Sequence, residues 1–147
     1  MNDILKIRAY NFKDEKNVIG LWEQCNLLTS SNNPKLDIKR KCQENIDLFF
    51  VGEVEDEVIA TCMAGFDGHR GWIYYLAVHP EYQGNGFGKA IVKHAEDSLR
   101  NRGCPKIDLM VRDTNRKVIE FYERIGFSQE PVIVLGKRLN KDEEYKN

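Results

Sequence analysis

The sequence predicts a mixed α/β domain whose central sheet is mostly antiparallel, contains one parallel pair of strands and carries helices on both faces. Two β-rich segments, Leu48–Val54 and Glu57–Phe66, are separated by only two acidic residues and therefore predict an antiparallel hairpin. Further along, a strand pattern at Trp72–Val78, a helix pattern at Phe87–Arg102 and a strand pattern at Lys106–Arg112 follow one another. This order predicts a right-handed crossover and parallel pairing of the two strands.

The front of the chain predicts one strand and two helices. Residues Ile4–Arg8 alternate apolar and polar side chains, as a half-buried strand does. The stretch Lys13–Leu28 has apolar side chains at helical spacing, namely Val18, Leu21, Trp22 and Cys25. A polar break at Ser30–Pro34 leads into a second, weaker helix pattern at Pro34–Ile46.

The second half of the chain has equally regular patterns. The turn Asp67–Gly71 precedes the strand at 72–78, and the helix at 87–102 has apolar residues every fourth position, at Phe87, Ile91, Ala95 and Leu99. Thr114–Ile125 predicts a further amphipathic helix, which Gly126 ends. Val132–Lys137 predicts a last strand, and Asn140–Asn147 a charged, solvated tail. Since no repeat or linker divides the chain, residues 1–147 are expected to form a single domain.

Composition excludes several classes of function. The 147 residues include 22 Lys and Arg and 23 Asp and Glu, with no basic run that could follow a nucleic acid backbone. No stretch reaches the roughly 18 apolar residues of a membrane span, and the N-terminus lacks a signal-peptide pattern. We therefore expect a soluble, cytoplasmic protein that binds neither nucleic acid nor membrane.

The four cysteines, Cys25, Cys42, Cys62 and Cys104, show neither C-x-x-C spacing nor a neighbouring histidine cluster. We expect reduced, partly buried thiols and no metal site. A nucleophilic Cys104 is a weaker alternative, because its neighbours Gly103 and Pro105 indicate a loop that ends a helix.

The segment Gln83-Gly84-Asn85-Gly86-Phe87-Gly88 follows a predicted strand and opens a predicted helix. Glycines allow a tight backbone turn, and the first amides of a helix have no intrahelical partner, so they can point at phosphate oxygens. The segment is therefore a candidate diphosphate site. The alternative is a tight turn that binds no ligand.

The spacing of these glycines excludes two familiar phosphate-binding loops. A dinucleotide fold needs G-x-G-x-x-G, and Lys89 stands where the third glycine should be. A Walker loop needs Gly-Lys followed by Ser or Thr, whereas Ala90 follows Gly88-Lys89. The pattern that remains is Q-x-x-G-x-G on a turn from strand to helix.

These residues resemble the GCN5-related N-acetyltransferase (GNAT) family from about Leu48 to about Leu135. Three segments carry the resemblance: Leu76–Pro80 running into the glycine turn, the strand Ile107–Arg112, and Asn115 followed by Phe121-Tyr122 and Gly126-Phe127. The resemblance implies a single GNAT-like domain in which the parallel strand pair splays apart, and an acetyl-CoA-binding core at about 48–135. Dimers are common in that family, so a homodimer is a further expectation.

The resemblance also implies the roles of the site residues. Acetyl-CoA would be the acyl donor, with its pantetheine arm along the backbone of Leu76, Ala77 and Val78. Its diphosphate would lie on the glycine turn, at Gln83, Gly84, Asn85, Gly86, Phe87, Gly88 and Lys89. An extended pantetheine arm with two amides can bind a strand edge as an added peptide strand does.

Two residues of the predicted helix 114–125 complete this set. By resemblance, Tyr122 is the general acid that protonates the departing thiolate of CoA, a role that suits a phenol with an ordinary pKa near ~10. The alternative is that it only packs beside Phe121. Asn115 matches an asparagine that contacts the cofactor arm, and it is equally suited to cap the helix.

The general base is left open. Some members of the family carry a glutamate where this chain has Met110. The alternatives are Asp108, Tyr75 or a chain of water molecules, while His79, His69 and His94 are expected to be surface histidines. The leading hypothesis is an acetyl-CoA-dependent N-acetyltransferase that acts on a primary amine of a small molecule or a protein by direct transfer in a ternary complex. The alternative is a non-catalytic acyl-CoA sensor. The acceptor is expected to lie against residues 11–46.

Overall fold

The computed structural model describes residues 4–146. In this range the chain forms two compact units. The first contains the residues up to Asp108 together with those from Asp142 onward, and the second is Leu109–Lys141. None of the helices in these residues combines the length and the apolar run that a membrane crossing requires.

The first unit is built on a sheet whose described strands follow the order β1-β2-β3-β4-β5. Their bounds are Lys6–Ala9 (β1), Phe49–Val54 (β2), Glu57–Phe66 (β3), Gly71–Val78 (β4) and Ile107–Asp108 (β5). Neighbouring strands are antiparallel except β4 and β5, which are parallel. The predicted fold class, a mostly antiparallel sheet with one parallel pair, is confirmed.

The hairpin of β2 and β3 shows how local sequence sets this sheet. Its turn is the dipeptide Glu55-Asp56, whose φ angles of 50° and 65° are both left-handed. Two-residue turns of this kind match the twist of antiparallel strands. The predicted hairpin is therefore confirmed, with its bounds within one residue of those expected.

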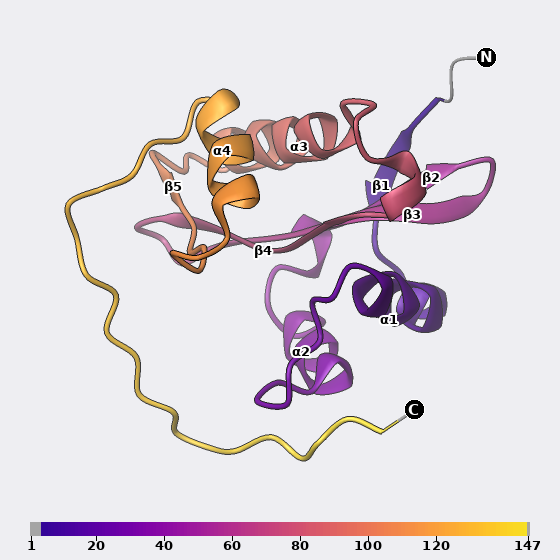
Figure 1. Cartoon of the computed structure of the whole chain (residues 1–147), viewed down its shortest axis with the longest axis horizontal. Helices are drawn as coiled ribbons and strands as arrows, with labels where there is room; N and C mark the ends of the chain where they lie inside the picture. Colours follow the sequence, from indigo (N-terminus) through magenta and orange to yellow (C-terminus); the bar gives the residue numbers. More distant parts are fainter. Residues whose placement is uncertain (1–3, 147) are drawn as a thin grey trace. The chain divides into compact units, whose positions relative to one another are not determined.

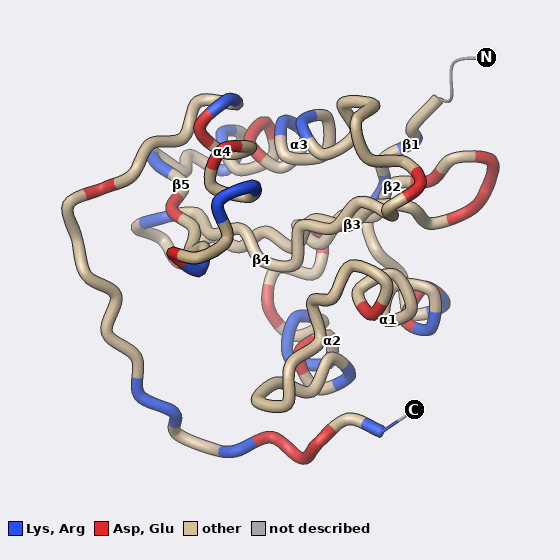
Figure 2. Tube along the Cα trace, viewed as in Figure 1, with Lys and Arg blue, Asp and Glu red and all other residues tan. Residues whose placement is uncertain are grey.

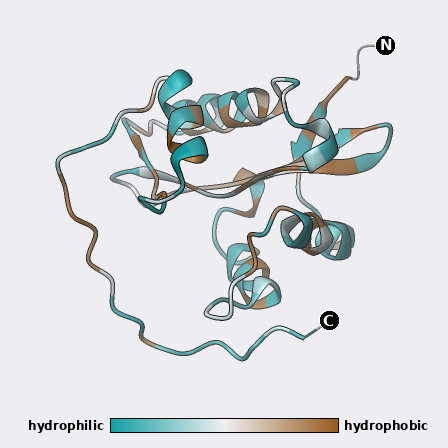
Figure 3. Cartoon of the chain, viewed as in Figure 1, coloured by the Kyte–Doolittle hydropathy of each residue, from teal (hydrophilic) through white to brown (hydrophobic). Residues whose placement is uncertain are grey.

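Helices cover both faces of the sheet (Figure 1). The helices α1 (Glu15–Gln24) and α2 (Pro34–Lys41) lie on one face and α3 (Phe87–Asn101) on the other. Short 3-10 turns at Phe12–Asp14 (η1), Ile46–Leu48 (η2) and Pro80–Tyr82 (η3) complete the first unit. Hydrophobic residues follow the strands, and the outward side of α3 is hydrophilic (Figure 3). The fully buried side chains at the centre of the core include Trp22, Phe49, Ile91 and Leu99.

The second unit contains the helix α4 (Arg116–Arg124), followed by residues 127–141, which form neither helix nor strand. Gly126 stands directly after the helix and its C-cap, with φ of 104°, a left-handed conformation that glycine adopts without strain. The predicted helix and its glycine stop are confirmed.

Two predicted strands differ from the structure. The expected strand at Lys106–Arg112 is reduced to Ile107–Asp108, and the expected strand at Val132–Lys137 is wrong. In the latter segment the side chains are exposed, and Ile133 is 87% exposed. A strand needs a neighbour to satisfy its backbone groups. Among the described residues no strand pairs with 132–137, so its apolar composition alone does not make it one.

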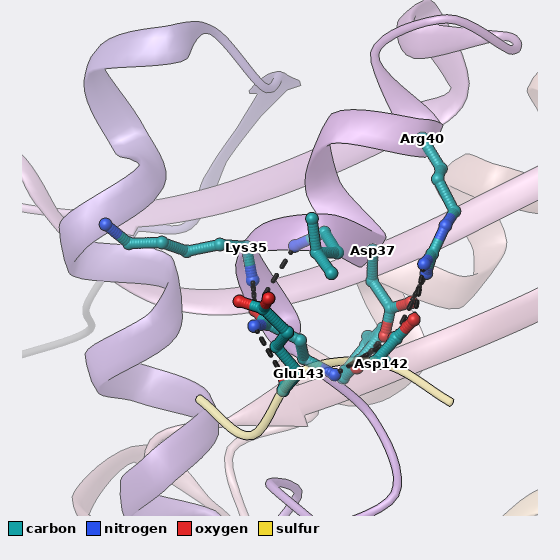
Figure 4. A network of polar contacts seen from close by, with 8 residues as sticks. Lys35, Asp37, Arg40, Asp142 and Glu143 are labelled. Carbon is teal, nitrogen blue, oxygen red and sulfur yellow. Dashed lines mark hydrogen bonds and ion pairs between the residues drawn. The ribbon is translucent and has the colours of Figure 1, made fainter. Parts of the chain in front are cut away.

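Two boundaries predicted from polar sequence are also corrected. The second helix ends at Lys41 rather than Ile46. The expectation of a solvated tail is wrong for Asp142, whose side chain is only 8% exposed and accepts from Arg40 (Figure 4), and for Tyr145, which packs against the core. Glu143 and Glu144 between them are exposed, as expected. Asn147 lies outside the described residues.

Candidate active site

Strand β4 contains a bulge that sequence analysis did not predict. Ala77 lies opposite Thr61 of β3, whereas Tyr74 lies opposite Met63, so two residues of β4 face one residue of β3. Such an extra residue bends a strand and redirects its backbone groups. Tyr75, in the bulge, has a φ of 50°, which is a strained conformation for a bulky side chain.

The bulge is held in place from helix α1. The indole Nε1 of Trp22 donates to the hydroxyl of Thr61 at 2.9 Å, and that hydroxyl donates to the backbone carbonyl of Tyr75 at 2.9 Å. The Trp22 and Tyr75 rings stack with their centroids 3.8 Å apart. Because Trp22 and Thr61 are both fully buried, these hydrogen bonds are made away from water.

On its other side, β4 has a long edge that β5 does not cover. The two strands pair only at Gly71 with Ile107 and at Trp72 with Asp108. Beyond this point the ladder stops, so the backbone of Ile73–Val78 is not paired to β5. The parallel pairing of β4 and β5, implied by the resemblance, is confirmed, and in the first unit it spans only these two residue pairs.

The carbonyl of Val78 marks the end of this edge. The next amide, that of His79, donates to Ile59 of β3 at 2.7 Å, so the Val78 carbonyl on the same peptide points to the opposite side. There it accepts a hydrogen bond from Gln83 Nε2 at 2.9 Å and from the Cys25 thiol at 3.3 Å. Burial raises the pKa of that thiol. Gln83 therefore ties the glycine turn to the strand, and Cys25 ties α1 to it.

The glycine turn has the conformation that its sequence predicts. Gly84 and Gly86 have φ angles of 82° and 80°, and a methyl group built on either would meet no atom within 4 Å. The side chain of Asn85 donates to the carbonyl of Tyr82 at 3.1 Å and closes the loop from inside. The outer surface of the turn is left open.

Helix α3 begins directly after this turn. Its N-cap is Gly86, which has no side chain that could accept from the first amides of the helix. The amides of Phe87, Gly88 and Lys89 consequently have no intrahelical partner. The buried Phe87 ring anchors the helix start, and the Lys89 side chain is exposed. This arrangement suits an anion, as the sequence predicted, and binding itself stays a prediction.

The remaining predicted residues belong to the second unit. Asn115 is the N-cap of α4 and accepts from the Val118 amide at 3.4 Å, so its predicted capping role is confirmed. Tyr122 is 7% exposed, and its ring packs edge to face on Phe121 and Phe127. Packing is therefore one role of Tyr122, and its catalytic role stays a prediction.

The position of the family glutamate offers no base in this chain. Met110 is 54% exposed and carries no ionisable group. Asp108, the first alternative, lies between two cations, with Arg70 Nε at 3.7 Å and Lys106 Nζ at 3.5 Å. The Asp108 carboxylate is therefore engaged in two ion pairs within the first unit.

Tyr75, the second alternative, is also poorly suited. Its hydroxyl donates to the carboxylate of Asp37 at 2.6 Å, and burial together with this contact raises its pKa. A phenol whose pKa is raised stays protonated near neutral pH, so it cannot act as the base that takes a proton from the amine. The Nδ1 atom of His79 accepts from the Glu81 amide and caps the turn η3, which agrees with the expected turn histidine. Transfer of the proton to water is the alternative that these contacts favour.

In residues 4–146, no three His, Cys, Asp or Glu side chains are placed together to hold a metal ion. The four cysteines are free thiols, and the Cys104 thiol donates to the carbonyl of Lys106 at 3.3 Å. This contact places Cys104 in a loop that ends α3, as the sequence predicted.

Sequence comparison identifies related proteins. A family model described as "Acetyltransferase (GNAT) family" matches residues 12–127. Acetyltransferase SG1711 of Sodalis glossinidius (strain morsitans), a curated protein, is 49% identical over 142 residues, which cover 96% of this chain and 100% of that protein.

Solved structures have the same fold at lower identity. The ribosomal-protein-S18-alanine N-acetyltransferase of Escherichia coli superposes with a TM-score of 0.74 at 22% identity, over 86% of this chain and 79% of that one. The protein AAC(6')-Iy, solved with the bisubstrate analogue CoA-S-monomethyl-acetylneamine, gives a TM-score of 0.76 at 17% identity, over 92% and 99%. At these identities the likeness confirms the fold.

Proposed function

The chain belongs to the acetyltransferase (GNAT) family and is an acetyltransferase, and from this premise we propose that it moves an acetyl group from acetyl-CoA to a primary amine of a small molecule or protein, within a ternary complex. One observation carries the proposal. The uncovered edge of β4 ends at Val78, and the Gln83 side chain connects this end to an open glycine turn at the start of α3.

These features fit acetyl-CoA as a substrate. The amide groups of the pantetheine arm would pair with the backbone of Leu76–Val78, as an added strand does. The diphosphate would lie on the turn at 83–89, where Gly84 and Gly86 leave space and the first amides of α3 point outward. The Lys89 ammonium would add a positive charge.

The bulge would position the acetyl group. The tetrahedral intermediate of acetyl transfer carries a negative oxygen, and a backbone amide fixed before the reaction stabilises it without reorganisation. The amides of Leu76–Val78 are fixed in this way, because Thr61 and Trp22 hold the adjacent carbonyl of Tyr75.

In the proposed reaction, the neutral amine attacks the thioester carbon and forms the new C–N bond. The C–S bond then breaks, and the CoA thiolate takes a proton from the Tyr122 hydroxyl. The proton of the amine passes to water, since Met110 carries no base in place of the family glutamate, and solvent returns a proton to the Tyr122 phenolate. Asn115 would contact the cofactor arm. Both roles in the second unit rest on the resemblance.

The test is a thiol-release assay with acetyl-CoA and a panel of amines and peptides. We expect at least one acceptor to raise CoA release above hydrolysis. Loss of a general acid typically lowers rates by about 10²–10⁴-fold, so Tyr122→Phe should lower kcat strongly and leave the affinity for acetyl-CoA unchanged. Tyr74→Phe, at an exposed strand tyrosine, is the matched control and should retain full turnover.

Calorimetry of acetyl-CoA binding separates the two hypotheses. Binding without turnover on any amine would favour the non-catalytic sensor. Full turnover of Tyr122→Phe would remove Tyr122 from the mechanism but would leave the enzyme proposal standing. Absence of both binding and turnover would contradict the proposal as a whole.

A further inference from the structure

The left-handed residue of the bulge, Tyr75, is held from three directions. Its backbone carbonyl accepts from the Thr61 hydroxyl at 2.9 Å, and its ring stacks on Trp22 with the centroids 3.8 Å apart. Its own hydroxyl donates to the carboxylate of Asp37 in helix α2 at 2.6 Å. A bulky residue with a φ of 50° keeps this strained conformation only where the surrounding contacts determine it. The contact with Asp37 is the one that the proposed reaction does not yet use.

Both oxygens of the Asp37 carboxylate have partners. Oδ2 accepts from the Tyr75 hydroxyl, and Oδ1 accepts from the Arg40 guanidinium at 3.0 Å. The Asp37 side chain is 23% exposed, so both contacts are partly shielded from water. A carboxylate that is held at both oxygens cannot rotate without losing one of them. Asp37 therefore presents Oδ2 to the Tyr75 hydroxyl in one orientation, in the short, strong kind of hydrogen bond that an ionised acceptor forms.

Arg40 is fixed in turn from the other end of the sequence. The Asp142 carboxylate accepts from its two terminal nitrogens at 2.5 and 3.3 Å (Figure 4). Asp142 also accepts from the backbone amide of Asn33, the N-cap of α2, and the Asn33 side chain donates to the carbonyl of Glu143. All of these residues belong to the first unit. A continuous set of contacts thus runs from residues 142–143 through Arg40 to Asp37.

The conformation of Tyr75 determines the direction of the next amide. The peptide between Tyr75 and Leu76 is planar, so the Tyr75 carbonyl and the Leu76 amide turn together. Leu76–Val78 is the segment whose amides would stabilise the negative oxygen of the tetrahedral intermediate. That stabilisation depends on where the donors point before the reaction. A misplacement on the order of 1 Å can lower a rate by about 10²-fold.

We propose that Asp37 is a positioning residue for acetyl transfer: through the Tyr75 hydroxyl it keeps the bulge in the conformation that aims the Leu76–Val78 amides at the negative oxygen. The inference rests on the proposed acetyl transfer and adds helix α2 to its site. Asp37 itself touches no reacting atom and takes no proton. Because the negative oxygen exists only along the reaction, loss of this contact lowers kcat far more than the affinity for acetyl-CoA.

The experiment is a double-mutant cycle on kcat, with an acceptor found in the amine panel. Tyr75→Phe keeps the ring and removes the hydroxyl, and Asp37→Ala removes its acceptor. Each should lower kcat about tenfold, and the double variant should be no slower than either single variant, because both remove the same contact. Asp37→Asn keeps an oxygen that can accept from Tyr75 and should retain kcat within about threefold of the wild type.

Acetyl-CoA affinity in these variants, measured by calorimetry, should fall by no more than about twofold, because Thr61 still holds the Tyr75 carbonyl. Two variants serve as matched controls. Tyr74→Phe removes the hydroxyl of the neighbouring, exposed tyrosine. Asp14→Ala removes a buried carboxylate that pairs with Arg8 at 2.8 Å, so it should lower the free energy of unfolding in urea. Both controls should leave kcat unchanged.

Two-dimensional amide NMR spectra recorded without acetyl-CoA give a second readout that needs no turnover. The amide signals of Leu76–Val78 should move in Tyr75→Phe and Asp37→Ala and keep their positions in Asp14→Ala. Wild-type kcat in Asp37→Ala, additive losses in the double variant, or an equal loss of kcat in Asp14→Ala would overturn the inference while acetyl transfer itself persisted. Failure of every amine to be acetylated would overturn it together with the proposed function.

Discussion

Replacing Thr61 with valine tests whether the bulge in β4 depends on one buried hydroxyl. Valine has nearly the same shape as threonine, so Thr61→Val removes two hydrogen bonds and leaves no cavity. The Nε1 of Trp22 then loses its acceptor and the Tyr75 carbonyl loses its donor. Since Trp22 is fully buried, water cannot replace the lost partner without opening the core.

The expected loss follows from the number of groups left without a partner. A buried polar group that loses its hydrogen bond costs about 1–3 kcal/mol. Two such groups predict that the free energy of unfolding falls by about 2–6 kcal/mol. Thr61→Ser retains the hydroxyl and removes only a methyl group, so its expected cost is about 1 kcal/mol.

Urea unfolding followed by tryptophan fluorescence measures both variants against the wild type. Acetyl-CoA affinity, measured on the folded variants by calorimetry, should fall in Thr61→Val and stay close to wild type in Thr61→Ser. If Thr61→Val were no less stable than Thr61→Ser, the hydroxyl would not hold the bulge and the reasoning would be refuted.

Two further predictions concern the turns. Gly86→Ala forces alanine into a left-handed conformation at a cost of about 1–2 kcal/mol, and its methyl group would occupy the proposed diphosphate space, so calorimetry should show acetyl-CoA binding at least about tenfold weaker. Gly68→Ala has the same backbone strain at φ of 93° and should retain affinity for acetyl-CoA; an equal loss of affinity in both variants would contradict the proposed diphosphate site. The amides of Arg70 and His69 and the Trp72 indole donate to Asp67 and lower its pKa to about 2. Because the pKa of Asp67 is lower in the folded state than in the unfolded state, the ionised carboxylate stabilises the fold. This stabilisation is present above about pH 4 and is lost as pH falls toward 2. Asp67→Asn should therefore lower the free energy of unfolding in urea more at about pH 5 than at about pH 3. An equal loss at both pH values would contradict stabilisation by the ionised Asp67 carboxylate.

The fold could be predicted from the sequence where local pattern and tertiary contact agree. The hairpin turn Glu55-Asp56, the amphipathic α3 and the glycine stop at Gly126 each depend on neighbouring residues, and each is confirmed. Strand formation at Val132–Lys137 depends on a partner elsewhere in the chain, and an apolar run contains no information about that partner. The predicted strand there is wrong for this reason.

The candidate site could be predicted from the sequence only where it depends on neighbouring residues. The glycine turn is local, so its left-handed residues Gly84 and Gly86 follow from the sequence. The bulge depends on contacts among three elements, and Tyr75 is not a residue type that marks a left-handed position. One signal was available: Thr61 is a hydroxyl residue within the apolar run 58–65, and a buried hydroxyl requires partners.

The segment Asp142–Tyr145 shows why composition alone does not predict how a charged terminal segment packs. Residues 140–147 contain so many charges that solvation is the reasonable expectation from composition alone. The acidic residues of this segment nevertheless lie against the protein, because the neighbouring helix α2 is rich in lysine and arginine (Figure 2). The aromatic side chain of Tyr145 adds buried area to this contact.

The two halves of the proposed acetyl-CoA site are fixed from opposite faces of the sheet. Trp22 reaches the bulge from α1, whereas the glycine turn continues into α3 on the other face. The diphosphate and the thioester would therefore be positioned by separate packing contacts that meet only at the end of β4. In this proposed arrangement, changes in α1 for a different acceptor would leave the turn that would bind the donor diphosphate unchanged. The hydrogen bonds of Val78 to Gln83 and Cys25 are the place where the two halves are coupled.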